Sequence, residues 1–388
     1  MPFPFTSTHA ASGWPQLPPP RPLPRLPCPA LLAFACALLA PAAAAGDPQP
    51  PSPRLHVPFP DERLVIHGLP WFAEDRPVLR RLPARLKDSF PSAVWGLAQQ
   101  PSGGRIRFRT DSTTVGLVAE NPRFSNMHHM ASVGENGFDL YVGRTCLGSA
   151  WPDGAGKIVR EWTIGRERTM RDVTLYLPLY KSVTIQELTL DADARLEPPR
   201  PYAVRKPVVY YGSSITQGGC ASNAGGSCQA ILERRLDADF VNLGFSGSGL
   251  GEPALAQAIA ELDPSCIVLD YWGNPSADQY AATLPAFVDI LRAKHPSVPI
   301  LIVGPFYFPM EAAIVGAAKA QDAKRATARA FVAARRKQGD RRIVFVDGLR
   351  MLDPSQSEGL VDGIHCNSLG FYFNANGLEP FLRKALRL

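Results

Sequence analysis

Strand-length apolar runs alternate with helix-length stretches through the second half of this 388-residue chain. The apolar runs cover residues 208–211, 240–243, 267–271, 300–303 and 343–346. The helical stretches cover residues 229–236, 253–262, 278–294, 312–337 and 369–386. Strands that alternate with helices form a parallel sheet covered on both faces, and sites in such sheets lie beyond the carboxyl ends of the strands. The pattern therefore predicts an α/β domain over residues 207–388, with its site at that edge.

Short alternating segments without long helical stretches fill the region upstream of this domain. In one of them Arg105, Arg107 and Arg109 alternate with apolar residues, which is the period of a strand with one solvent-exposed face. Repeated short strands of this kind are typical of an antiparallel sandwich. We therefore expect an all-β sandwich domain over residues 60–198, and the Pro-rich stretch 196–207 is expected to link it to the α/β domain.

The first 45 residues have the composition of a leader segment. Arg21 and Arg25 precede an apolar run at residues 28–40 and a cluster of alanines that ends at Ala45. Positive charge, a short apolar run and small residues at a cleavage site describe a secretory signal peptide. The run is too short to span a bilayer core of about 30 Å comfortably. We expect cleavage near Ala45, a secreted or periplasmic protein, and no integral membrane span in the mature chain.

The charge distribution argues against nucleic acid as a partner. The net charge is +6, but Lys and Arg are scattered and do not gather in one run. Binding to nucleic acid requires a basic stripe on one face of the protein. The hydrophobic fraction of 45% and the charged fraction of 20% are those of a globular protein.

Five cysteines follow the leader: Cys146, Cys220, Cys228, Cys266 and Cys366. Export would permit disulfide bonds between them. Cys220 and Cys228 flank a loop rich in Gly, Ser and Asn and could be bridged, and Cys366 could lie close to both. Cys266 lies in an apolar run and is expected to be a buried thiol. The sequence alone leaves the pairing open.

We expect neither a metal site nor a cofactor. The chain has no Cys-x-x-Cys pair that would favour zinc. The pair His128 and His129 has no carboxylate or histidine partner at a ligand spacing, so we interpret it as a feature of a loop. The glycines from Gly247 to Gly251 miss the Gly-x-Gly-x-x-Gly spacing of a nucleotide loop, and no Walker lysine follows them.

Four short motifs follow one another along the α/β region. They read Gly212-Ser213-Ser214-Ile215-Thr216, Gly244-Phe245-Ser246-Gly247, Gly273-Asn274 and Asp362-Gly363-Ile364-His365. The first three motifs follow the first three predicted strands, and the fourth precedes the last helix. A parallel sheet would therefore bring all four together at its carboxyl edge.

The motifs contain the groups of a serine esterase. Ser214 lies on a tight strand-to-helix turn and is the candidate nucleophile, His365 is the candidate base, and Asp362 can hold the imidazole in the correct tautomer. The backbone amides of Ser214 and Gly247 and the side chain of Asn274 are candidate donors to the oxyanion. Each residue also has a structural explanation, such as a turn or a helix cap, but the agreement of order and chemical role makes coincidence improbable.

Ser246 is a rival candidate for the nucleophile. Ser246 lies in Gly-Phe-Ser-Gly-Ser, which lacks the second glycine of the Gly-x-Ser-x-Gly elbow. Ser214 lacks that glycine too, because Thr216 occupies its position. Ser214 is the preferred nucleophile because the order of the four motifs, their places at strand ends and their chemical roles agree.

The four motifs resemble those of the SGNH (GDSL-type) hydrolases, whose blocks contribute Ser, Gly, Asn and His. These correspond to Ser214, Gly247, Asn274 and His365, and Asp362 completes the Asp-x-x-His pattern. The first block departs from Gly-Asp-Ser-Leu by a serine and an isoleucine, and the third reads Trp-Gly-Asn-Pro. The form Gly-Ser-Ser-Ile-Thr-Gln-Gly resembles one branch of the family, in which a β-sandwich with a Gly-x-Asp-Leu-Tyr signature comes first. Gly137-Phe138-Asp139-Leu140-Tyr141 matches that signature.

The resemblance covers roughly residues 60–388. It implies a flavodoxin-like parallel sheet of about five strands, preceded by a jelly-roll-like all-β sandwich, and metal-free esterase chemistry. Members near this branch include acetylesterases that act on plant polysaccharides such as xyloglucan, and some members are acyltransferases.

We therefore predict a serine esterase that removes short O-acyl groups, foremost acetyl, from a carbohydrate or another small ester. An acyltransferase using the same acyl-enzyme and a non-enzymatic carbohydrate-binding protein are the alternatives. The sugar, the acyl length, the choice between hydrolysis and transfer, the oligomeric state, the mature start and the role of the sandwich stay open.

Overall fold

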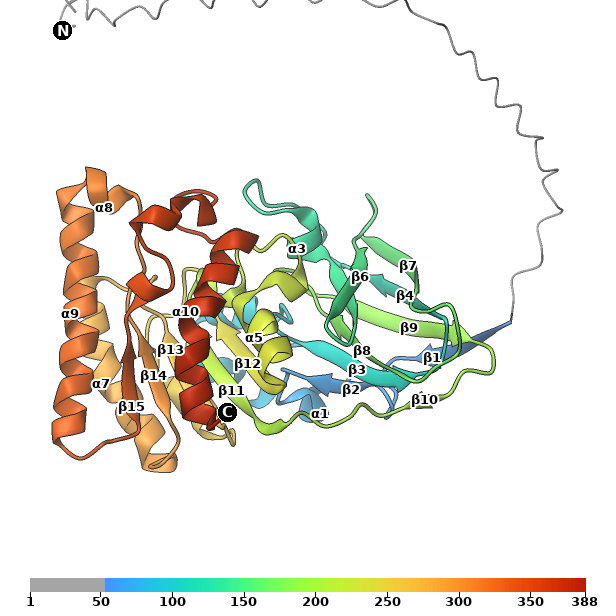
Figure 1. Ribbon diagram of the computed structural model, residues 1–388, viewed down its shortest axis with the longest axis horizontal. Coiled ribbons are helices and arrows are strands. Elements are labelled where there is room, and N and C mark those ends of the chain that lie inside the picture. The colour runs from blue at the N-terminus through green and yellow to red at the C-terminus, as the bar shows by residue number, and fades with distance from the viewer. Residues whose placement is uncertain (1–52) are drawn as a thin grey trace, which may run out of the picture. The chain divides into compact units, whose positions relative to one another are not determined.

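Five parallel strands form the sheet predicted for the second half of the chain, in the order β12-β11-β13-β14-β15 (Figure 1). They are β11 (Val204–Gly212), β12 (Ala238–Gly244), β13 (Cys266–Asp270), β14 (Ile300–Val303) and β15 (Ile343–Val346). Each predicted apolar run falls on one of them. The central strand β13 is fully buried from Cys266 to Leu269, as expected for a sheet covered on both faces. The predicted fold class is confirmed.

Helices cover both faces of this sheet. They are α4 (Ser214–Gln217), α5 (Cys228–Leu236), α6 (Pro253–Ala260), α7 (Ala277–Lys294), α8 (Met310–Ala313), α9 (Val315–Lys337) and α10 (Ser368–Leu386). Helices α5 and α10 contact each other, and α6, α7 and α9 form a second group (Figure 1). The stretch predicted as one helix over residues 312–337 is divided into α8 and α9. Asn367 caps α10 by accepting a hydrogen bond from the amide of Gly370 at 3.0 Å.

Two antiparallel sheets pack over the first half of the described chain. One has the order β1-β9-β4-β7 and the other β10-β3-β8-β5-β6, with β2 paired to β3. The strands are β1 (Arg54–Pro58), β2 (Val65–His67), β3 (Arg105–Thr110), β4 (Thr114–Glu120), β5 (Phe138–Val142), β6 (Thr145–Ala150), β7 (Lys157–Thr163), β8 (Arg171–Tyr176), β9 (Thr184–Asp191) and β10 (Leu196–Glu197). Short helices α1 (Phe72–Asp75), α2 (Ser92–Ala98) and α3 (Ser132–Asn136) interrupt them. The predicted β-sandwich is therefore present.

The computed structural model describes residues 53–388, and these belong to one compact unit. The signal peptide expected over residues 1–45 lies outside the described residues. Among the described helices, none combines the length and the apolar character that a membrane crossing requires. Short 3-10 turns complete the described chain: η1 (Ala84–Ser89), η2 (Ala224–Gly226), η3 (Gly348–Arg350) and η4 (Pro354–Gly359).

The arginine face of β3 is not solvent-exposed, contrary to the expectation from the sequence. Arg105 is fully buried and Arg107 nearly so, whereas Arg109 stays partly accessible. Arg105 forms an ion pair with Asp239 on β12 and also donates to the carbonyl oxygen of Phe240 at 3.1 Å. The alternation correctly identified a strand, but its polar face packs against the α/β sheet and not against water.

Buried arginines from the N-terminal segment donate hydrogen bonds to backbone carbonyls along the outer edge of β12, which is the terminal strand of its sheet. Arg105 donates to the carbonyl of Phe240, and Arg81 donates to the carbonyls of Asn242 and Gly244. Successive acceptors among these three are two residues apart, so all three face the same side of the strand. A terminal strand otherwise presents a row of unpaired polar groups. The two guanidinium groups occupy that row.

The stretch expected as a linker takes part in the same contact. Tyr202 is buried, receives a hydrogen bond from Arg105 Nε at 3.0 Å and donates one to Glu233 Oε1 at 2.8 Å. Arg107 lies over the Tyr202 ring, with its guanidinium carbon 3.8 Å from the ring centroid. The segment between β10 and β11 is therefore anchored at the junction.

We expect Arg105→Met to lower the free energy of unfolding by about 3–5 kcal/mol, because it removes the fully buried guanidinium that pairs with Asp239 and donates to the carbonyl of Phe240. Arg109→Met is the matched control on the same strand. Arg109 pairs with partly exposed Glu197, and such pairs are worth about 0–1 kcal/mol. Denaturant titration of both variants measures the difference. An equal loss in the two variants would contradict a special role for the buried pair.

Candidate active site

The candidate nucleophile Ser214 is the first residue of α4, directly after β11. Ser213 caps this helix, because its hydroxyl accepts a hydrogen bond from the amide of Ile215 at 3.3 Å. Gly212 is required at the end of the strand: a Cβ there would collide with Thr216 Oγ1 and with the carbonyl oxygen of Asp270. The turn therefore holds Ser214 in one position at the carboxyl edge of the sheet.

The structure brings Ser214, His365 and Asp362 together. Ser214 Oγ lies 2.8 Å from His365 Nε2, and His365 Nδ1 lies 2.7 Å from Asp362 Oδ2. An ionised carboxylate can only accept, so Nδ1 carries the hydrogen and Nε2 is free to accept the Ser214 hydroxyl hydrogen. This is the order of contacts that the sequence predicted.

Asp362 is held in its ionised form. Burial is the largest single influence and would raise the pKa of the carboxyl group. Hydrogen bonds from the His365 amide at 2.8 Å, from its ring and from the Ile364 amide at 3.0 Å outweigh burial and lower the pKa to about 2. Asp362 therefore carries a negative charge beside His365 at any pH near neutrality.

The backbone around His365 is fixed on both sides. The Val361 amide donates to the carbonyl oxygen of His365 at 2.8 Å, and the Cys220 amide donates to the carbonyl oxygen of Cys366 at 2.9 Å. The second bond joins the loop that follows the nucleophile helix to the loop that carries the histidine. The two halves of the site are thereby connected through main-chain atoms.

Two of the three predicted oxyanion donors are backbone amides whose hydrogens have no protein acceptor within the described residues. Within residues 53–388, the amides of Ser214 and Gly247 donate to no protein acceptor. Gly247 has φ of +64°, and a Cβ there would meet nothing within 4 Å. Asn274 differs, since its Nδ2 donates to the carbonyl oxygens of Phe245 at 3.0 Å and Gly249 at 3.2 Å. It braces the loop that carries Gly247, and its role as a third donor stays a prediction.

The Gly-x-Asp-Leu-Tyr signature reaches the loop after the nucleophile. Asp139 on β5 is buried, and its Oδ2 accepts hydrogen bonds from Asn223 Nδ2 and from the Gly225 amide, both at 2.6 Å. The ring of Tyr141 lies against Gly225, where a Cβ would come within 2.6 Å of Tyr141 Cε2. The sandwich therefore fixes the segment that begins at Cys220 and contacts the histidine loop.

Two family models match the chain in succession. Residues 59–196 match the N-terminus of the SGNH-hydrolase-type esterases with the GxDLY motif, and residues 205–383 match the GDSL-like lipase/acylhydrolase family. The chain belongs to the GDSL-like lipase/acylhydrolases. It is an esterase or acylhydrolase of the SGNH type, as the four motifs predicted.

Several solved structures share this architecture. A putative GDSL-like lipase from Bacteroides ovatus has 27% sequence identity and a TM-score of 0.79, covering 86% of this chain and 98% of that one. The salicylyl-acyltransferase SsfX3 of a tetracycline biosynthetic pathway has 23% identity and a TM-score of 0.71, covering 85% and 97%. A family two carbohydrate esterase from Clostridium thermocellum, solved with cellohexaose, has 16% identity and a TM-score of 0.56, covering 74% and 93%. The last two show the fold alone. Comparison with curated proteins gives no match.

One further residue lies at the candidate site of this GDSL-like hydrolase without any signal in the sequence. His129 lies in a loop, as expected, but its ring centroid is 5.5 Å from that of His365. It comes from the segment between β4 and α3 in the sandwich. No spacing rule connects two residues so far apart in the chain, and only the adjacent His128 made the position noticeable.

The cysteines are free thiols throughout the described residues, so the possible bridge between Cys220 and Cys228 is not formed. Cys228 opens α5, whereas Cys220 lies beside the histidine loop. The expectation that Cys366 lies close to Cys220 is correct, because their segments share a main-chain hydrogen bond. Cys266 is fully buried in β13, as predicted.

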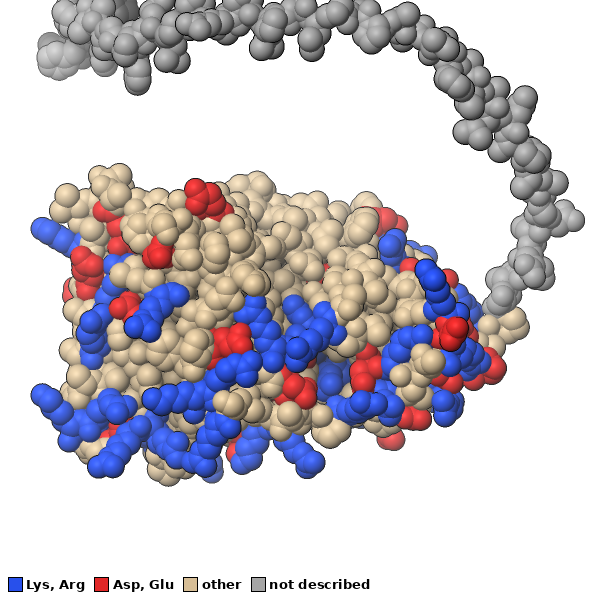
Figure 2. Space-filling model, in the orientation of Figure 1, with Lys and Arg blue, Asp and Glu red and all other residues tan. Residues whose placement is uncertain are grey.

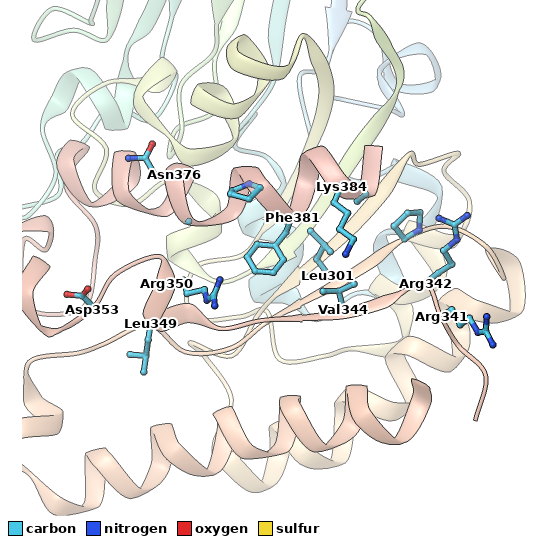
Figure 3. Close-up of a pocket in the computed structure, with 14 residues that line it drawn as sticks. Leu301, Arg341, Arg342, Val344, Leu349, Arg350, Asp353, Asn376, Phe381 and Lys384 are labelled. Carbon is cyan, nitrogen blue, oxygen red and sulfur yellow. The ribbon is translucent and has the colours of Figure 1, made fainter. Parts of the chain in front are cut away.

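One pocket of the GDSL-like hydrolase lies away from Ser214, His365 and Asp362. It has a volume of about 830 Å³ and lies between the sheet edge at β15 and helix α10 (Figure 3). Phe381, Leu301 and Val344 line it together with basic side chains such as Lys384. This pocket contains neither the candidate nucleophile Ser214 nor the candidate base His365.

Asp270 lies beneath the nucleophile turn. It accepts hydrogen bonds from Thr216 Oγ1 at 3.1 Å and from Trp272 Nε1 at 2.8 Å, and it lines a small cavity with Thr216 and Gln229. Burial raises the pKa of its carboxyl group to about 7, although both hydrogen bonds act in the opposite direction. The folded protein therefore keeps a proton on Asp270 that the unfolded chain loses near pH 4.

We expect this proton to leave a signature in stability. Between about pH 4 and pH 7 the folded state binds one proton more than the unfolded state at Asp270, so this group reduces the free energy of unfolding by about 1.4 kcal/mol per pH unit as the pH rises. Asp270→Asn removes that contribution. Denaturant titrations across this range should show wild type losing stability relative to the variant with rising pH. Parallel curves for the two proteins would contradict the raised pKa.

Proposed function

We propose that the chain is a serine esterase that removes short O-acyl groups, foremost acetyl, from a carbohydrate. The proposal rests on one observation above the others, the continuous hydrogen-bonded series from Ser214 Oγ through the His365 ring to Asp362. Such a series is how a weak serine hydroxyl is made nucleophilic. The family places this chemistry among esterases and acylhydrolases.

In the acylation step, Ser214 Oγ attacks the ester carbonyl carbon and its proton passes to His365 Nε2. The ionised Asp362 stabilises the imidazolium that forms. The carbonyl oxygen becomes an oxyanion and takes the free amide hydrogens of Ser214 and Gly247, each worth roughly 100- to 1,000-fold in rate at comparable sites. Asn274 would join them as a third donor by releasing one of its two loop carbonyls.

The imidazolium then protonates the ester oxygen of the sugar as the bond to the acyl carbon breaks, which releases the sugar hydroxyl and leaves an acyl group on Ser214. A water molecule enters, gives its proton to His365 Nε2 and attacks the acyl carbon. Collapse of the second intermediate returns the proton to Ser214 Oγ and releases the carboxylic acid. Every proton in this cycle passes through the one nitrogen that lies 2.8 Å from the nucleophile.

A carbohydrate substrate is supported by the fold relatives and by the surface. The carbohydrate esterase from Clostridium thermocellum was solved with cellohexaose. Charged side chains are sparse along the upper rim in Figure 2, where Figure 1 places α3 and the start of α10, which suits a neutral polysaccharide such as xyloglucan. The signal-peptide-like leader supports a secreted or periplasmic location for this activity.

Acyl transfer is the second candidate. The structural similarity to the salicylyl-acyltransferase SsfX3 favours it, since that protein shares both halves of the architecture. The same acyl-enzyme would form, and a hydroxyl of an acceptor would replace the water. Product analysis with and without a candidate alcohol acceptor separates the two reactions.

Hydrolysis of p-nitrophenyl esters from acetate to octanoate should be greatest for acetate. Ser214→Ala should abolish it, because loss of a triad serine typically costs about 10⁶-fold in kcat. Ser246→Ala is the matched control, a nearby serine without a histidine contact, and should remain active. A preference for octanoate would point to lipid substrates. Loss of activity in Ser246→Ala but not in Ser214→Ala would overturn the assignment of the nucleophile.

Asp362→Asn should lower kcat by about 10⁴-fold, because an amide at this position stabilises the wrong tautomer of the histidine. KM should change little, since Asp362 contacts the histidine and not the substrate. Steady-state kinetics at neutral pH measures both constants. A variant that raised KM while keeping kcat would assign Asp362 to substrate binding instead.

A further inference from the structure

Three potential metal ligands meet beside the nucleophile. Within the described residues, one ligand atom each of His129, Cys220 and His365 lies within 4.8 Å of the other two. The three residues come from the sandwich, from the loop after α4 and from the loop before α10. None of the spacing patterns that mark metal sites in sequences connects them, so only the fold brings them together.

His129 has an unsatisfied polar atom. Its Nδ1 is buried and has no hydrogen-bond partner in the described chain. Leaving a buried polar atom unpaired costs about 1–3 kcal/mol. A bound cation that engages the His129 ring would give this histidine a polar partner.

The segment that carries His129 is held in place. Glu135, which is fully buried in α3, accepts a hydrogen bond from the Met127 amide at 2.7 Å and an ion pair from Lys181 at 2.9 Å. Met130 is buried on the other side of His129. The imidazole is therefore presented to the site by a fixed backbone, which lowers the entropic cost of binding a ligand.

His365 and Cys220 are suited to complete the set. His365 Nδ1 is engaged by Asp362, so Nε2 is its available ligand atom, and a carboxylate behind a ligating histidine is the usual outer partner in metal sites. Cys220 is a free, buried thiol. Two imidazole nitrogens and one thiolate form a donor set for zinc and similar cations, whereas magnesium and calcium require oxygen ligands.

We propose that His129, Cys220 and His365 bind a thiophilic divalent cation such as Zn²⁺, and that this binding reversibly inhibits the enzyme. On binding, the Cys220 thiol releases one proton to solvent, and His365 Nε2 exchanges its hydrogen bond with Ser214 for a bond to the metal. Zinc bonds of about 2.0–2.3 Å require donors roughly 3.3–3.6 Å apart, so the ligands must approach by about 1 Å. A water or Ser214 Oγ would fill the fourth position.

The inhibition follows from competition for one lone pair. His365 Nε2 cannot accept the proton of Ser214 while it binds a cation, so the nucleophile loses its base. The inhibitory part of the proposal rests on the proposed esterase function, but metal binding does not. The experiment therefore measures binding and activity separately.

Titration of the apoprotein with Co²⁺ tests binding without any substrate. We expect thiolate-to-cobalt charge-transfer absorption in wild type, displaced by Zn²⁺ and not by Mg²⁺. Cys220→Ser should abolish the band, and His129→Ala should weaken binding by at least about tenfold, since even outer partners of a metal ligand are worth 10- to 100-fold. Cys228→Ser, which alters a buried free thiol outside the cluster, should retain it. Thermal melts without metal verify that each variant is folded.

Ester hydrolysis with added Zn²⁺ tests the inhibition. Wild type should lose activity and recover it on chelation, and His129→Ala should require at least about tenfold more zinc for the same fractional loss, in line with its weaker binding. Absent cobalt absorption in wild type, or absorption that survives in Cys220→Ser, would overturn the site. Binding without inhibition of an active enzyme would overturn the inhibitory role. Binding by a protein that hydrolyses no ester would support the site and refute the proposed function.

Discussion

The placement of the active site depends on how the edge of the parallel sheet is closed. β12 is the terminal strand, and the loop that carries Gly247 begins where it ends. Guanidinium groups from Arg81 and Arg105 occupy the carbonyls along its outer side. Buried charges of this kind are costly unless they are paired and hydrogen-bonded. The contact therefore specifies one register between the two halves, and with it the position of the oxyanion loop.

The triad lies in the α/β half, but its geometry draws on both halves. Asp139 of the sandwich fixes the loop that contains Asn223 and Gly225. The same loop begins at Cys220, whose amide holds the backbone next to His365. A series of hydrogen bonds thus runs from the signature motif of the first half to the candidate base His365 of the second. The GxDLY motif has a physical meaning in this chain: its aspartate organises a loop of the neighbouring sheet.

Patterns in the sequence predicted the features of the fold that depend on neighbouring residues in the chain. The five strands followed from apolar runs of strand length, and the meeting of Ser214 with His365 followed from the rule that parallel strands end at one edge. The interior face of β3 was predicted wrongly, because alternation reveals that a strand has two faces and not what covers each of them. The proximity of His129 to His365 could not be predicted, because it depends on how two independently patterned segments dock. The free state of Cys220 likewise depends on three-dimensional positions that spacing does not encode.

The arginines that cover the outer edge of β12 also affect association between chains. A bare terminal strand is a template on which any extended peptide can add a further strand. Here the N-terminal half covers that strand edge with the guanidinium groups of Arg81 and Arg105 and not with another strand. Cleavage of the chain in the Pro-rich stretch near Tyr202, followed by separation of the two halves, would therefore expose the outer edge of β12. The α/β half could then pair with other chains along this edge, and such association would compete with folding.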